Sequence, residues 1–85
     1  MPTSAQVIVG ATATVLVAAT DFDQTAYLHN SGGGIVYLGA SNVTTANGYK
    51  LDNGDKLTVG VGDHEALYAI TASGTNVLSV LTQIN

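Results

Sequence analysis

The chain has 85 residues, of which 46% are hydrophobic and only 9% are charged, and its net charge at pH 7 is -4. Two lysines and no arginine argue against nucleic acid or an anionic membrane surface as a partner, because both are bound mainly through cations. The lack of cysteine excludes disulfides and thiolate metal sites. So short a chain builds a marginal core, and so few charges leave its surface open to association. We therefore expect an oligomer, or a protein covered by a larger assembly.

The N-terminus predicts an arm followed by one domain. Residues 1–5 are polar and include a proline, which is typical of a flexible or docking segment. We interpret residues 6–85 as a single β-sandwich domain. No charged segment followed by an apolar run marks a signal peptide, and no apolar run approaches the length of about 20 residues that spans a bilayer.

Short strands are predicted from the start of this domain. Residues 6–9 and 12–17 predict two strands separated at Gly10, because valine and threonine dominate and no period of 3.6 residues indicates a helix. We expect the second of these strands to be buried on both faces. Phe22, in the loop that follows, is expected to plug one end of the core. Residues 25–29 then predict the next strand.

The middle of the chain alternates strand-like runs with turn signals. Residues 35–38 are β-branched and aromatic, and the glycine-rich loop 30–34 before them predicts a hairpin. Asn53-Gly54 predicts a further hairpin turn, because this dipeptide tolerates positive φ angles. In residues 56–61, apolar side chains alternate with polar or small ones, as in a strand with one buried face.

Two more strands are predicted at residues 66–71 and 76–84. In the last strand both faces include apolar side chains: Leu78, Val80 and Thr82 on one face, and Val77, Ser79 and Leu81 on the other. One face can fill a core, and the other needs a second cover, most simply a neighbouring copy. The whole pattern predicts an all-β fold, a small antiparallel β-sandwich or barrel of about seven to eight short strands.

No set of residues converges into a catalytic, cofactor or metal site, so we expect no enzymatic activity, no cofactor and no metal. His29 and His64 match no metal-ligand spacing, although His64 has acidic neighbours, and a solvated turn is the favoured interpretation. Residues 52–55 resemble a calcium loop only faintly. They lack the later glutamate of an EF-hand and are better explained as a turn.

An ordered series of short motifs in the C-terminal two thirds of the chain resembles a known family. The motifs are Val36-Tyr37-Leu38-Gly39 with Val43-Thr44, Asn47-Gly48 with Leu51, Gly54-Asp55 with Leu57, and Leu67-Tyr68-Ala69-Ile70 with Ser73-Gly74-Thr75. Together they look like a small β domain of tailed-bacteriophage virions, described as a minor capsid or capsid decoration protein. The resemblance implies a non-enzymatic protein that is made in the host bacterial cytoplasm and binds the major capsid protein on the outer capsid surface, commonly as a homotrimer.

In such an oligomer, we expect the strands with two apolar faces to supply the contacts between copies. The expected interface residues are Val7, Val9, Val15, Val17, Val77 and Leu81. Closed symmetry would repeat each such contact around a rotation axis.

Two alternatives stay open. One is a tail, baseplate or fibre module of the virion, although the chain contains no coiled-coil or collagen-like stalk. The other is a carbohydrate-binding β-sandwich in which Tyr27, Tyr37 or Tyr49 forms a sugar-stacking platform. Glycan binding is also compatible with a decorated capsid.

Overall fold

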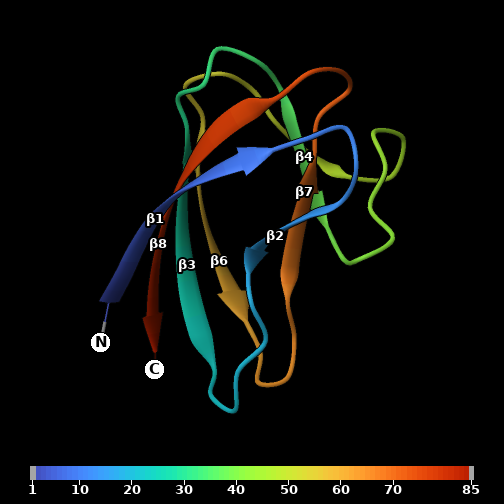
Figure 1. Ribbon diagram of the computed structural model, residues 1–85. Coiled ribbons are helices and arrows are strands. Elements are labelled where there is room, and N and C mark those ends of the chain that lie inside the picture. The colour runs from blue at the N-terminus through green and yellow to red at the C-terminus, as the bar shows by residue number, and fades with distance from the viewer. Residues whose placement is uncertain (1, 85) are drawn as a thin grey trace.

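The computed structural model describes residues 2–84, which form eight strands in two four-stranded antiparallel sheets (Figure 1). In chain order, the strands are β1 (Pro2–Val9), β2 (Thr14–Val17), β3 (Gln24–Asn30), β4 (Val36–Gly39), β5 (Tyr49–Leu51), β6 (Lys56–Val61), β7 (Leu67–Ile70) and β8 (Asn76–Ile84). Sheet A has the order β1-β8-β3-β6, and sheet B has the order β2-β7-β4-β5. The predicted all-β sandwich of seven to eight strands is confirmed.

The strand order is that of an eight-stranded jelly roll. Strands β1, β3, β6 and β8 belong to sheet A and the other four to sheet B, so only the β4–β5 connection stays within one sheet. Every other connection crosses from one sheet to the other. Pro2 pairs with Gln83 in the β1–β8 register, so the two ends of the described chain lie together at the lower end of the sandwich (Figure 1).

The core follows from the alternation of side chains along each strand. The predicted inward face of β6 is confirmed: Leu57 and Val59 pack against the core cluster and Val61 belongs to it. In β8, Leu78 and Val80 point inward, as the sequence indicated. The buried cluster draws on all strands of both sheets and consists of Val9, Leu16, Val17, Ala26, Leu28, Val36, Leu38, Leu51, Val61, Ala69, Leu78 and Val80.

The structure has a strand where the sequence predicted a flexible or docking arm at residues 1–5. Residues 2–5 are part of β1 and pair with β8 from Gln83 to Val80. Met1 lies outside the described residues. Because small and polar side chains can occupy an edge strand that is held by its backbone, the polar composition did not indicate this pairing.

Both predicted hairpins are also wrong. The loop at residues 30–34 connects β3 of sheet A to β4 of sheet B, and the turn at Asn53-Gly54 connects β5 of sheet B to β6 of sheet A. Gly54 does adopt a positive φ of 88°, so the turn chemistry was identified correctly. The same glycine turns serve a crossover between sheets as well as a hairpin.

Two expectations about burial near β2 differ from the structure. Phe22 is 57% exposed and does not plug the core. Strand β2 begins at Thr14, and its Val15 is exposed, so it is not buried on both faces throughout. Leu16 and Val17 are nevertheless both buried, because the register shifts between Val15 and Val17 and turns consecutive side chains inward.

A buried asparagine closes the upper end of the sandwich. The side-chain amide of Asn30 donates hydrogen bonds to the carbonyl oxygens of Gly34 and Leu51, at 2.8 and 2.9 Å. Its Oδ1 atom accepts from the Asn76 amide at 2.9 Å and from the backbone nitrogen of Gly32 at 3.3 Å. One side chain thereby ties together the β3–β4 and β5–β6 connections and the start of β8.

Candidate functional site

The outer face of sheet A carries the most varied exposed side chains that the strand register brings together. Gln6, Ser79, His29 and Lys56 lie side by side in one row across β1, β8, β3 and β6. Ser4, Leu81, Tyr27 and Thr58 form the next row, two residues further along each strand. Rows two residues apart are separated by about 7 Å, since each strand residue advances about 3.4 Å.

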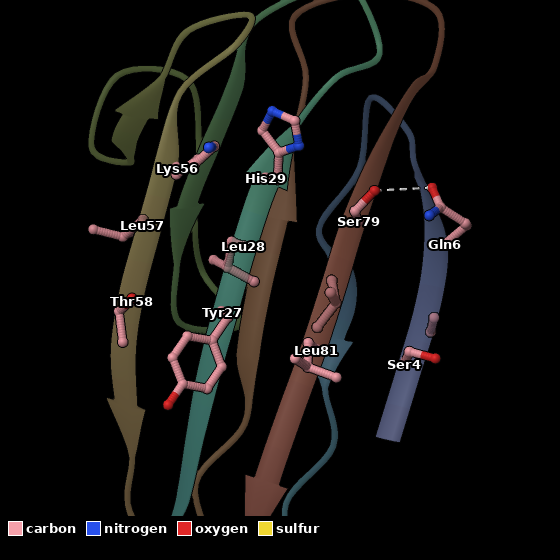
Figure 2. Close-up of a pocket in the computed structure, with 12 residues that line it drawn as sticks. Ser4, Gln6, Tyr27, Leu28, His29, Lys56, Leu57, Thr58, Ser79 and Leu81 are labelled. Atoms are coloured by element: carbon pink, nitrogen blue, oxygen red, sulfur yellow. Dashed lines mark hydrogen bonds between the residues drawn. The ribbon is translucent and has the colours of Figure 1, made fainter. Parts of the chain in front are cut away.

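These two rows line a shallow hollow of about 710 Å³, which we call the sheet A groove (Figure 2). The Tyr27 ring leans from β3 toward β6, and His29 lies above it on the same strand (Figure 2). On the other side of the groove, the Ser79 hydroxyl donates a hydrogen bond of 3.2 Å to the side-chain oxygen of Gln6, Oε1. The groove thus combines an aromatic ring with amide, hydroxyl and cationic groups.

The charges of the groove differ in sign from those of the whole chain. Lys56 and His29 line it, and no carboxylate does. The other lysine, Lys50, lies in sheet B and contacts Asp52 at 3.6 Å. Among residues 2–84, Lys56 is therefore the lysine without an ion pair. It lies in a protein whose net charge is -4.

The apolar part of the same face lies on β1 and β8. Ile8 and Val77 are directly opposite each other in the register and are 64% and 38% exposed, and Leu81 is 41% exposed. We call these three residues the β1–β8 patch. Ile8 was not among the expected interface residues, and its position beside Val77 became apparent only from the strand register.

The six expected interface residues do not share one surface. Val77 and Leu81 belong to the β1–β8 patch, whereas Val15 is exposed on sheet B. Val7 packs against the core cluster. The prediction is wrong for Val9 and Val17. They are 0% and 3% exposed within the chain itself and therefore cannot touch a partner.

The tyrosines of the sugar-platform alternative lie in three different places. Tyr27 is in the sheet A groove. Tyr37 is on β4 of sheet B, half-buried, and Tyr49 is on the edge strand β5 and largely exposed. Only Tyr27 lies in a hollow with other exposed polar side chains on all four strands of its sheet.

His64 lies at the lower end, between two carboxylates. Its Nε2 atom is 3.2 Å from Asp21 and its Nδ1 atom is 3.2 Å from Asp63, but all three side chains are mostly exposed. His64 has a positive φ of 63° because it occupies a tight turn, in which its backbone nitrogen donates to the Thr20 carbonyl. In residues 2–84, no group of three or more His, Cys, Asp or Glu side chains could hold a metal ion.

The acidic turn at residues 52–55 satisfies its own backbone. The Asp52 nitrogen donates to Oδ2 of Asp55 at 3.0 Å, and the Asp55 nitrogen donates to the Asp52 carbonyl, also at 3.0 Å. The Asn53 side chain accepts from the Gly33 nitrogen, which links the turn to the β3–β4 loop. These groups act as parts of a turn, as the sequence indicated.

Comparisons with known proteins add no relative to these observations. The chain matches no protein-family model and no curated protein. Within the described residues there is also no helix long and apolar enough to cross a membrane. The resemblance to capsid decoration proteins therefore stays a prediction.

Proposed function

We propose that this protein is a non-enzymatic structural protein of a bacteriophage virion. In this proposal it decorates and stabilises the outside of the capsid, binding the lattice of the major capsid protein as an oligomer, most simply a trimer. The observation that carries the proposal is the β1–β8 patch, where exposed apolar side chains gather on the flat face of a small and weakly charged domain.

The patch supports association for a physical reason. Burying Ile8, Val77 and Leu81 against another surface removes apolar area from water at about 25 cal/mol for each Å². The patch carries no charged side chain, so this burial requires no charge to be desolvated. When several copies bind a lattice together, modest contacts add to strong overall attachment.

The topology is consistent with this role without deciding it. Jelly rolls form the domains of many viral capsids and of lectins. The same fold hosts many functions, so the proposal depends on the surface and on the sequence resemblance rather than on the fold alone. A tail or fibre module of the same fold would be present in few copies.

The decisive experiment is to count this chain in purified virions by quantitative mass spectrometry against the major capsid protein. We expect hundreds of copies in a simple ratio to the capsid subunit, as a symmetric lattice requires. A handful of copies would instead assign the protein to the tail or to a vertex of the capsid. Absence from the particle would overturn the virion role.

The oligomer is tested separately with the purified protein. We expect Val77→Asp to convert the oligomer to monomers in sedimentation velocity, because it places a carboxylate directly opposite Ile8 in the buried patch. Val15→Asp is the matched control, since it adds the same charge to an exposed valine of sheet B. Dissociation by Val15→Asp alone would assign the interface to the opposite sheet.

A further inference from the structure

We propose that the sheet A groove binds an acidic saccharide, meaning a sugar that carries a carboxylate on its pyranose ring. The juxtaposition behind this inference is one exposed aromatic ring, one uncommitted lysine and several short polar side chains in a single hollow. The proposal goes beyond capsid decoration and does not depend on it, because the ligand is assigned to Tyr27 and Lys56 on β3 and β6. Leu81 of the β1–β8 patch also lines the groove, whereas Ile8 and Val77 do not.

Tyr27 supplies the stacking surface. Its side chain is 42% exposed and lies at the centre of the groove, between Leu81 on one neighbouring strand and Thr58 on the other. The face of a pyranose ring presents C–H groups, which pack on an aromatic ring while the sugar hydroxyls point outward. The half-exposed tyrosine thus provides an apolar platform next to a polar rim, as small-ligand sites commonly do.

The row of polar side chains next to Tyr27 can bind the hydroxyl groups of the sugar. Gln6 Oε1 accepts from Ser79, which fixes the orientation of the amide and leaves its Nε2 atom as a donor within the groove. His29 lies next to Ser79 and next to Lys56 in the register. A ligand on Tyr27 therefore meets donors and acceptors at a distance of about one row, or about 7 Å along the strands.

Lys56 determines the charge of the ligand. It lies one strand and one row away from Tyr27, and no carboxylate lines the groove. In a protein with six acidic residues and a net charge of -4, a cation without an ion pair in an acid-free hollow favours an anionic ligand. A carboxylate on a sugar ring can reach this ammonium while the ring stacks on Tyr27.

The alternative occupants fit the groove less well. An extended peptide binds sheets by adding to a free strand edge, but the floor of the groove is β8 and β3, which are paired on both sides. A second copy that buries Ile8 and Val77 need not cover Lys56, because these two apolar residues do not line the groove. The saccharide uses the side chains alone and leaves the ammonium partly in water.

The test is a titration of the ¹⁵N-labelled protein with trigalacturonic acid, followed by its backbone amide signals. The methyl ester of the same trisaccharide is the matched probe, because it keeps the rings and hydroxyls and loses the charge. We expect the acid to shift the signals of β3, β6 and β8 around Tyr27 and Lys56. The ester should bind about tenfold more weakly, as loss of one charge-assisted hydrogen bond implies.

Two variants locate the site, and two controls are matched to them. Lys56→Gln should weaken binding of the acid to the level of the ester, and Tyr27→Ala should abolish the shifts produced by both. Lys50→Gln and Tyr37→Ala make the same changes on sheet B and should leave binding unchanged. The amide spectra of all four variants report directly whether each is folded.

Several outcomes would overturn the proposal. Equal binding of acid and ester would remove the role of Lys56, and shifts confined to other strands would remove the groove. Equal binding of a tetraglutamate peptide would show recognition of charge alone. Concentration-dependent shifts of the Tyr27 and Lys56 signals without sugar would show that a second copy covers the site. No shift with the acid at about 10 mM would mean an affinity too weak for a site of this kind.

Discussion

The side-chain amide of Asn76 donates a hydrogen bond of 2.9 Å to Oδ1 of Asn30, and the two residues are 4% and 0% exposed. Asn76 Oδ1 in turn accepts from the Gly34 nitrogen at 3.2 Å. Together with the bonds from Asn30 to two carbonyl oxygens, this pair satisfies polar groups at the end of the core that would otherwise be buried without partners. No buried side-chain nitrogen or oxygen within the described residues lacks a partner.

Removing the buried hydrogen bonds of Asn30 should destabilise the fold more than removing an exposed hydrogen bond does. We expect Asn30→Ala to lower the free energy of unfolding by about 2–4 kcal/mol, because it leaves several buried backbone and side-chain groups unpaired. Urea denaturation measures the effect. Asn53→Ala is the control, since it removes one exposed bond to the Gly33 nitrogen and should cost less than about 1 kcal/mol. Equal losses in the two variants would contradict the role of burial.

Gly32 is required by close packing rather than by its dihedral angles. A Cβ atom there would meet the side-chain oxygen of Asn76 and would lie 2.7 Å from both the nitrogen and the oxygen of Val77. We expect Gly32→Ala to cost about 1–3 kcal/mol in urea denaturation, because the backbone of β8 would have to move. Gly60→Ala, where a Cβ meets nothing within 4 Å, should be neutral or slightly stabilising.

Leu78 and Phe22 were both predicted to lie in the core, and alanine substitutions should destabilise the protein to different extents at the two positions. Leu78 is fully buried, and we expect Leu78→Ala to lower the free energy of unfolding by about 2–5 kcal/mol. Phe22→Ala removes a larger side chain but should cost less than about 1 kcal/mol, because Phe22 is mostly exposed. A loss of several kcal/mol for Phe22→Ala would show that its ring is buried in solution.

Salt should not dissociate the proposed oligomer. The β1–β8 patch contains no charged side chain, and copies with a net charge of -4 repel one another. Raising the salt concentration from about 0.1 M to about 1 M shortens the screening length from about 10 Å to about 3 Å and weakens this repulsion. We expect the dissociation constant from sedimentation equilibrium to stay constant or to fall. A rise of about tenfold would indicate that ion pairs hold the interface.

The sequence predicted local structure well because side-chain alternation is a local property. The alternation in β6 and β8 identified their inward faces, and valine and threonine identified β1 and β2 as strands. Prediction from the sequence failed wherever a structural feature depended on which strands are neighbours in a sheet. The glycine loop at residues 30–34 has the chemistry of a turn, and nothing in that chemistry distinguishes a hairpin from a crossover between sheets.

The candidate site was beyond sequence reasoning for the same reason. Gln6, Ser79, His29 and Lys56 come from four separate strands, and only the register places them in one row. Val9 and Val17 were expected at an interface, yet apolar composition alone does not separate residues of a core from residues of a contact surface.

The pairing of β1 with β8 means that sheet A cannot be completed before β8 is available. Strand β1 has no neighbour in sheet A other than β8, and both neighbours of β3 come later in the sequence. During synthesis, β1 therefore remains without its partner in sheet A until β8 has emerged from the ribosome. Closing the long loop between β1 and β8 carries an entropic cost before their contacts form, so we expect this pairing to form slowly.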